Sequence, residues 1–160
     1  MYKEKEYLVE KLKEAGIKSQ VHSSLKKLKI CQETHVGAVL RVDETFTRSN
    51  HKKSYDSTDG ESKRRVRYYD RETKLKVVIA DNNEEKVENI LTEFLIVIGK
   101  GLLSDGEWRE IELGEAKWFE EGDSILKSKV AVELEVTFKG SIYKDRIMQR
   151  KGINVMASKE

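Results

Sequence analysis

A strict alternation of apolar and polar residues over positions 130–138 is the feature of this sequence that most constrains its fold. In VAVELEVTF, every second residue from Val130 to Phe138 is Val, Leu or Phe. Successive side chains of a β-strand point to opposite faces, so this period of two predicts a strand that is buried on one face. Glu133 and Glu135 then lie on the other face, where we interpret them as a solvated surface rather than as an acid–base pair.

Other segments show weaker strand patterns or helical spacing. Strands are predicted over four further segments, residues 37–47, 65–70, 75–80 and 108–113. Apolar residues at helical spacing predict one helix that Gly16 ends and a second helix over residues 82–98. The second helix has a broad apolar stripe and is expected to lie on the core. For residues 17–31 a strand, a loop and a short helix all remain open, and residues 115–123 are expected to form a loop.

The order of these elements indicates the fold class. Strands occur in runs and only two helices are clear, which predicts an α+β fold: an antiparallel β-sheet with two main α-helices packed on one face. Residues 48–62 lack periodicity and are rich in Ser, Asn, Asp and Gly, so we expect a long polar hairpin loop there. The length of 160 residues fits one domain, predicted over residues 1–146, with a flexible C-terminal tail over residues 147–160.

The sequence shows no catalytic, cofactor-binding or metal-binding constellation. The spacing of His22, His35 and His51 matches no metal motif, and the single Cys31 is interpreted as a small, half-buried residue. The Gly99-Lys100-Gly101 segment follows a helix, so its amides lie at the negative end of the helix dipole and do not form a phosphate loop. We therefore expect a protein without catalytic activity or a cofactor.

No apolar stretch of this sequence is long enough for the core of a signal peptide or for a membrane span. The first fifteen residues alternate charged and apolar side chains, and the longest apolar run is Phe94 to Ile98. One cysteine cannot form an internal disulfide, which fits a reducing compartment. These features predict a cytoplasmic protein that has no membrane partner.

Charge is distributed unevenly along the chain. Charged residues make up 38% of the sequence, above the roughly 25% typical of soluble domains, while the net charge is only +2. Residues 48–67 contain seven basic residues against three acidic ones, a net charge of +4; the basic residues are Arg48, Lys52, Lys53, Lys63, Arg64, Arg65 and Arg67. Residues 105–123 contain eight acidic residues against two basic ones, a net charge of −6; the acidic residues are Asp105, Glu107, Glu110, Glu112, Glu115, Glu120, Glu121 and Asp123.

This segregation of charge allows three interpretations. Both segments can belong to an ordinary solvated surface. They can instead be complementary edges of a head-to-tail contact between identical subunits, which closes into a ring when the rotation allows it. The basic segment alone can also contact the phosphates of a nucleic acid, although only Tyr55, Tyr68 and Tyr69 accompany it for base stacking.

A succession of elements along the chain points to a family. An N-terminal helix precedes a strand that begins with GAVL, and a hairpin with a long polar loop follows. The strand over residues 75–80 then runs into a helix that begins with NNEE, and the alternating strand over residues 130–138 precedes GSIY. Over roughly residues 3–146, this order resembles the tail terminator, or tail-completion, proteins of tailed bacteriophages and prophages.

The resemblance implies a structural protein of the virion tail that is assembled in the host cytoplasm. Proteins of this family form a hexameric ring on the end of the tail tube, stop its polymerisation and provide the surface that joins the tail to the head. The implied partners are identical subunits, the tail tube protein and the head–tail connector protein. DNA passes through the lumen without sequence-specific binding, and no cofactor takes part.

Two hypotheses on assembly follow from the resemblance and the charge pattern. The loop over residues 48–64 is expected to become ordered when it docks on the tube or the connector. The acidic segment is expected to pair with the basic segment of a neighbouring subunit. The alternatives are a nucleic-acid-binding accessory protein that uses the basic segment 48–67, and another neck or tail component of the same particle.

Overall fold

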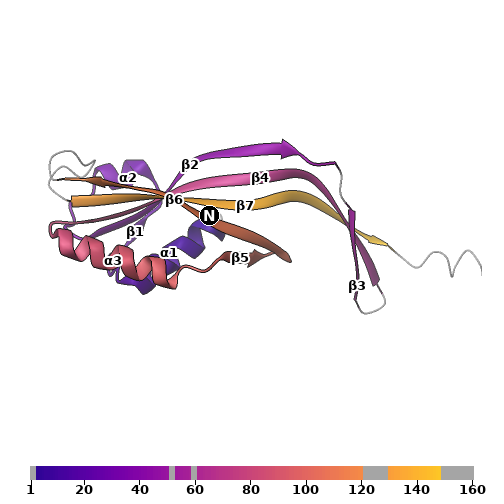
Figure 1. Cartoon of the computed structure of the whole chain (residues 1–160), viewed down its shortest axis with the longest axis horizontal. Helices are drawn as coiled ribbons and strands as arrows, with labels where there is room; N and C mark the ends of the chain where they lie inside the picture. The colour runs from indigo at the N-terminus through magenta and orange to yellow at the C-terminus, as the bar shows by residue number, and fades with distance from the viewer. Residues whose placement is uncertain (1–2, 51–52, 59–60, 121–129, 149–160) are drawn as a thin grey trace, which may run out of the picture. The chain divides into compact units, whose positions relative to one another are not determined.

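A computed structural model describes residues 3–50, 53–58, 61–120 and 130–148 of the chain (Figure 1). In these residues it contains three helices and seven strands. In chain order they are α1 (Lys3–Ala15), β1 (Val21–His22), α2 (Leu25–Lys29), β2 (Val36–Arg48), β3 (Lys53–Thr58), β4 (Glu61–Asp81), α3 (Glu84–Val97), β5 (Gly101–Ser104), β6 (Glu107–Phe119) and β7 (Val130–Met148).

All seven strands belong to one sheet, in the order β1-β2-β4-β7-β6-β5, and β3 pairs with β4 outside this path. Strand β6 pairs antiparallel with both β5 and β7, and β3 pairs antiparallel with β4. Strands β1 and β2 run parallel. The α+β class is therefore confirmed, but the prediction of a purely antiparallel sheet is wrong. The exception lies in residues 17–31, where the sequence left a strand, a loop and a short helix open and the structure contains both β1 and α2.

The chain divides into two compact units. The first unit comprises residues 1–44 and 72–140, and the second comprises residues 45–71 and 141–160. Strands β2, β4 and β7 each contribute residues to both units.

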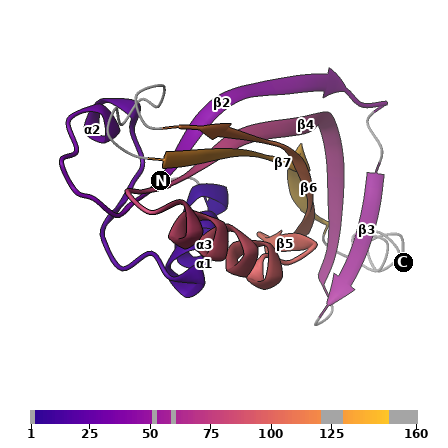
Figure 2. The same cartoon turned by 60° about the vertical axis from the view of Figure 1, so that its left-hand side comes forward.

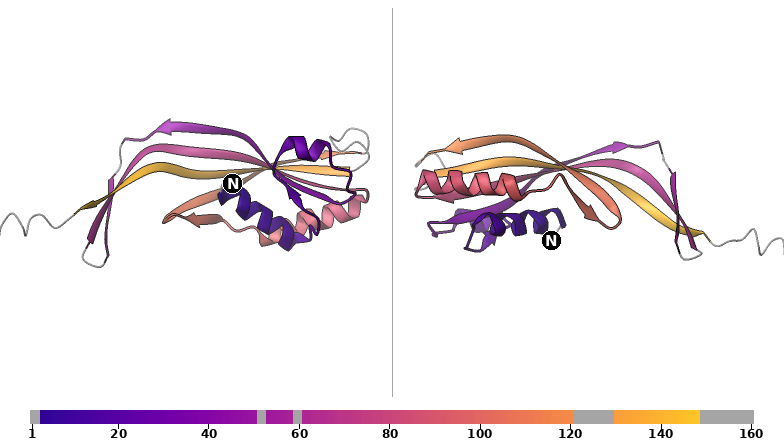
Figure 3. Two further views of the ribbon diagram at one scale, coloured as in Figure 1. Left: turned by 180° about the vertical axis from the view of Figure 1, so that it is seen from behind. Right: turned by 60° about the horizontal axis from the view of Figure 1, so that its bottom comes forward.

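The first unit is built around a core between α1, α3 and one face of the sheet, and Figures 2 and 3 show the two helices lying side by side. The helices contribute apolar side chains at helical spacing, and the strands contribute every second residue. Its largest fully buried apolar side chains include Phe94, Phe138, Leu8, Leu12 and Ile79. The alternating residues from Val132 to Phe138 all face this core, as their period of two predicted.

The opposite face of the same strands carries a second, smaller core beneath α2. Leu28 of this five-residue helix is buried against small side chains of β2 and β4, including Ala38 and Ala80. Ser24 caps the helix by accepting a hydrogen bond from the Lys27 amide at 3.2 Å. The sheet of the first unit thus has helices on both faces, with the two long ones sharing one core and α2 on the other.

The second unit contains the β3–β4 hairpin and corrects the expected polar loop over residues 48–62. Strand β3 pairs antiparallel with β4 in a register that runs from Lys53 opposite Val66 to Thr58 opposite Glu61. The hydrogen-bond ladder needs no apolar periodicity, and the hairpin has few apolar residues, so its sequence shows the pattern of a loop although it forms a strand. Loop ordering on docking is therefore the wrong hypothesis for the paired residues 53–58 and 61–66.

Three strands also extend further than predicted. The separate strands predicted over residues 65–70 and 75–80 are one continuous strand, β4. Strand β6 continues to Phe119, through much of the segment expected to be a loop, and β7 continues past Phe138 to Met148. Of the predicted tail over residues 147–160, the first two residues complete β7, and residues 149–160 lie outside the described part of the chain.

The strands predicted from the sequence do not include β5, although a local signal for it exists. Asp105 and Gly106 form a two-residue connection between β5 and β6, and their φ angles are 54° and 75°. Positive φ at both central residues is typical of the tight hairpin turn that Asp-Gly favours. The Asp-Gly pair is therefore a local sequence signal for this hairpin.

The core of the first unit leads to a prediction on stability. Phe94 of α3 is fully buried, whereas Ile96 on the same helix is 69% exposed. We expect Phe94→Ala to lower the free energy of unfolding by about 3–5 kcal/mol, because it removes buried apolar surface and leaves a cavity. The matched control Ile96→Ala should change it by less than about 0.5 kcal/mol. Urea unfolding of both variants measures the difference, and equal losses would contradict the placement of α3.

Candidate functional site

The outer edge of β6 is open over most of its length. Strand β5 pairs with β6 only from Glu107 to Glu110, and one further bond joins the Ile111 amide to the Lys100 carbonyl at 2.9 Å. Beyond this point, up to Phe119, no strand among the described residues pairs with that edge. The backbone groups on an open edge are available to another strand.

The other end of the sheet has a second open edge. Strand β1 pairs only with Gly37 and Ala38 of β2. From Val39 onward, the outer edge of β2 has no strand partner within the described part of the chain. Within the first unit this leaves residues 39–44 of β2 as an open edge, on which the Val42 side chain is 46% exposed.

A β-bulge changes which side chains of β6 share a face. The register shifts between Leu113, which lies opposite Val136, and Ala116, which lies opposite Leu134. Without the bulge, Leu113 and Trp118 would lie on opposite faces, because Trp118 is five positions, an odd number, after Leu113. With it, both side chains lie at the rim of the main core, 42% and 43% exposed.

Two further large apolar side chains are exposed on the β5–β6 hairpin. Leu103 and Trp108 lie directly opposite each other in the register, 68% and 57% exposed. The Trp108 ring lies over Gly101, where an added Cβ would clash with the ring. Exposed apolar side chains beside an open sheet edge are typical of a surface that binds another protein chain. The alternation of apolar and polar residues does not predict this surface. These side chains are exposed because the neighbouring strand β5 is short, and strand length cannot be seen in the alternation.

The predicted acidic residues are spread along one hairpin of the first unit. Glu110, Glu112, Glu115 and Glu120 are exposed on or just after β6. Two others are less available to another molecule: Asp105 pairs with Lys3 at 2.8 Å, and Glu107 is buried. Glu121 and Asp123 lie outside the described residues.

The predicted basic residues belong to the second unit, and part of their charge is used inside it. The Arg65 guanidinium binds both carboxylate oxygens of Asp145 at 2.9 and 3.2 Å, and it lies 3.6 Å from the centre of the Tyr143 ring. Arg67 pairs with Asp70 at 3.5 Å, and Arg48 lies over the Tyr69 ring. The remaining basic positions are Lys53, which is exposed, Arg64, which is half-buried, Lys63, whose side chain is not described, and Lys52, which lies outside the described residues.

The sheet face opposite the main core carries cross-strand ion pairs beyond the part that α2 covers. Lys76 and Lys74 of β4 pair with Glu133 and Glu135 of β7, at 3.2 and 3.9 Å. The Glu135 side chain is 44% exposed, which fits the expected solvated surface, whereas the Glu133 side chain is only 13% exposed. Lys139 of β7 pairs with Glu112 of β6 at 2.5 Å on the same face.

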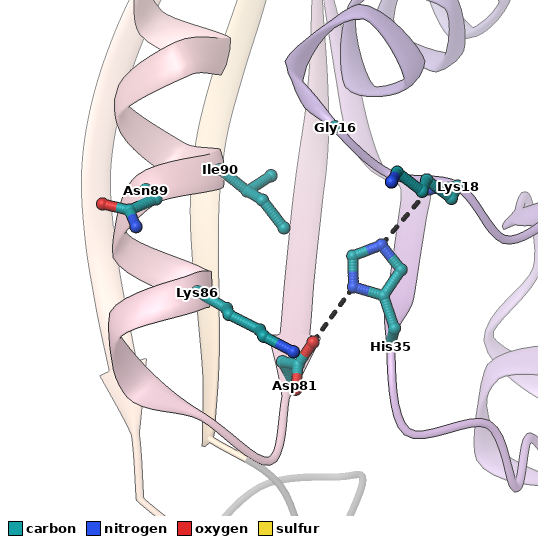
Figure 4. A pocket seen from close by; sticks show the side chains of 7 residues that line it. All are labelled: Gly16, Lys18, His35, Asp81, Lys86, Asn89 and Ile90. Atoms are coloured by element: carbon teal, nitrogen blue, oxygen red, sulfur yellow. Dashed lines mark hydrogen bonds and ion pairs between the residues drawn. The ribbon is translucent and has the colours of Figure 1, made fainter.

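A pocket of about 470 Å³ lies beside His35, between the segment that follows α1 and the start of α3 (Figure 4). The Lys18 amide donates a hydrogen bond to His35 Nε2 at 3.2 Å, which assigns the proton of the neutral ring to Nδ1. That proton faces Asp81 Oδ2 at 3.0 Å, and Asp81 Oδ1 accepts from the Asn83 amide at 3.3 Å. Both ring nitrogens of His35 thus have hydrogen-bond partners within the first unit.

Three potential metal ligands that the sequence spacing did not connect lie together elsewhere in the first unit. They are His22, Cys31 and Glu33, whose donor atoms lie within 4.8 Å of one another. Cys31 lies nine positions after His22 and two before Glu33, a spacing that matches no zinc motif. The three residues come together because α2 lies between His22 and Cys31 and returns the chain toward β1.

Comparisons with known proteins do not place this chain in a family. No protein-family model matches it, and no curated protein is significantly similar to it. In the part of the chain that the structure describes, none of the helices is both long enough and apolar enough to cross a membrane.

The Glu112–Lys139 pair leads to a prediction on pH. The hydrogen bond and charge of Lys139 lower the pKa of Glu112, and Glu112 in turn raises the pKa of Lys139. The lowered pKa means that the glutamate stabilises the fold above its unfolded-state pKa and loses this effect as the pH falls through its folded-state pKa. The raised pKa of Lys139 means that its effect is present below its unfolded-state pKa and is lost as the pH rises through its folded-state pKa.

We expect an NMR titration of the Glu112 carboxyl to show a pKa below the usual glutamate range. Lys139→Gln should raise this pKa, because it removes both the donor and the charge. Lys86→Gln, on the exposed surface of α3, is the matched control and should leave the Glu112 pKa unchanged. An unchanged value in Lys139→Gln would contradict the ion pair.

Proposed function

We propose that this protein is a phage or prophage tail terminator, which assembles into a hexameric ring on the end of the tail tube. The observation that carries the proposal is the presence of two open sheet edges in the first unit, residues 112–119 of β6 and residues 39–44 of β2. When one edge binds the other edge of the next copy, the contact is head-to-tail. A repeated contact of this kind closes into a ring when the rotation per subunit allows it.

Backbone pairing supplies the proposed contact, and side chains select its register. An added strand gains main-chain hydrogen bonds along the edge, and the exposed Trp118 and Val42 lose water contact when a neighbour covers them. Exposed ion pairs are each worth only about 0–1 kcal/mol, so the acidic residues of β6 adjust the register more than the strength. Ring formation should therefore weaken only moderately as salt is added.

The β3–β4 hairpin is the proposed docking element for the tube or the connector. Its paired strands exist before docking, so the element binds as a formed ribbon whose surface includes Tyr55, 67% exposed. This replaces the hypothesis of a loop that orders on contact. Binding through a formed hairpin carries a smaller entropic cost than binding through a disordered loop.

A nucleic-acid-binding function remains the second candidate and is tested by the same protein preparation. The pairing of Arg65 with Asp145 and Tyr143 weighs against it, because this guanidinium is already engaged. A DNA affinity that falls steeply with salt would favour it over the terminator function. Another neck or tail component of the same particle would share the ring but would not cap tubes.

Charge placed on either open edge should prevent ring formation. The variants are Trp118→Lys on β6 and Val42→Lys on β2, and native mass spectrometry over a concentration series measures the assembly. We expect the wild type to form closed rings of six copies, and each variant alone to remain monomeric, because lysine on an edge opposes strand addition. Ile96→Lys, on the exposed surface of α3, is the matched control and should still form rings.

Mixing the two edge variants tests the head-to-tail arrangement directly. Each variant retains one intact edge, and the two intact edges are different, so an equimolar mixture should form heterodimers that do not grow further. A two-fold symmetric contact would instead allow one of the variants to dimerise alone. A wild type that is monomeric both alone and in the presence of tail tubes would contradict the proposal.

Removal of the hairpin should separate docking from ring formation. Deletion of residues 50–60 removes β3, and we expect rings to form at wild-type concentration but to bind tail tubes no longer. Electron microscopy of polymerising tubes, with and without the variant, measures the tube length and the presence of caps. Normal capping by the deletion variant would show that the hairpin is not the docking element.

A further inference from the structure

Three side chains around α2 point to a metal site. His22 comes from β1, Cys31 follows α2, and Glu33 precedes β2. One donor atom from each residue lies within 4.8 Å of the other two. His22 and Cys31 are partly buried and Glu33 is exposed, so the cluster lies at the surface with two of its ligands covered.

A second observation concerns the histidine ring. The Nε2 atom of His22 is buried and has no hydrogen-bond partner among the described residues. A buried polar atom without a partner destabilises the folded state, so such an atom calls for an explanation. A metal ion bound through Nε2 gives this atom a partner and leaves Nδ1 as the hydrogen-bond donor of the ring.

The donor set selects the class of metal. A thiolate, an imidazole and a carboxylate together are typical ligands of Zn²⁺, whereas Mg²⁺ and Ca²⁺ prefer oxygen ligands alone. At zinc bond lengths of about 2.0–2.3 Å, the donors of a tetrahedral site lie about 3.5 Å apart, so small side-chain rotations bring the three atoms into place. Three protein ligands leave the fourth position to water.

We propose that His22, Cys31 and Glu33 form a zinc site that holds α2 and its flanking segments against the sheet. The helix has five residues, and Leu28 is its one buried side chain, so the segment between β1 and β2 has few other anchors. Cys31 packs at the edge of the second core, and zinc bound there joins the end of this segment to its beginning. Binding releases the thiol proton to solvent, so the affinity falls as the pH is lowered.

Cobalt titration of the full-length, untagged protein tests the site, because Co²⁺ replaces Zn²⁺ and reports on sulfur ligation. We expect a thiolate-to-cobalt charge-transfer band that saturates at one equivalent and disappears when Zn²⁺ is added. Cys31→Ser should abolish the band, and Glu33→Gln should weaken binding at an exposed position where the fold is not at risk. Glu93→Gln, on the exposed surface of α3, is the matched control and should bind as the wild type does.

Thermal unfolding provides an independent readout. A ligand that binds only the folded state raises the unfolding temperature, so Zn²⁺ should stabilise the wild type and Glu93→Gln but not Cys31→Ser or His22→Gln. The absence of a charge-transfer band in the wild type would overturn the proposal. So would a band or a thermal shift of equal size in Cys31→Ser, which would indicate adventitious binding elsewhere on the chain.

Discussion

The first unit depends on the burial of the central strands on both faces. In β4, Val77 and Ile79 face the core that α1 and α3 cover, while Val78 and Ala80 face the smaller core beneath α2. A slip of one residue would exchange the two sets, and Ala80 would replace Ile79 against the helices. The sheet register therefore cannot change without loss of both cores, and the positions of the edges and of α2 follow from it.

The same arrangement leaves the sheet incomplete at both ends. Strand β1 has two residues and β5 has four, so each covers only part of the longer strand beside it. The bulge in β6 then returns Trp118 to the face on which Leu113 lies, at the rim of the main core. Open backbone and exposed apolar side chains therefore coincide on one strand, and the proposed ring uses this coincidence. The zinc site concerns a different part of the unit, so either proposal can fail without the other.

Charge segregation along the chain is weaker in the folded protein than in the sequence. Arg65 is engaged by Asp145 and Tyr143, and Lys3 neutralises Asp105, a residue 102 positions away. Glu112 pairs with Lys139 across two strands. Such long-range partners reduce the charge available to another molecule, so the net charges of +4 and −6 overstate what either segment offers. The two sheet edges that have no strand partner among the described residues are therefore a clearer feature of the surface than its charge.

The sequence alone determined the two long helices, the alternating strand and the α+β class. These features are local, because the period of burial records which face of an element meets the core. The hairpin of β3 and β4 and the edge strand β5 escaped this reading, since backbone pairing leaves little trace where no face is buried, although Asp105-Gly106 offered a turn signal. Only the tertiary structure decided which edges stay open, which charges are paired, and that His22, Cys31 and Glu33 meet. Each of these depends on contacts between residues that are separated in the chain, and no local pattern encodes them.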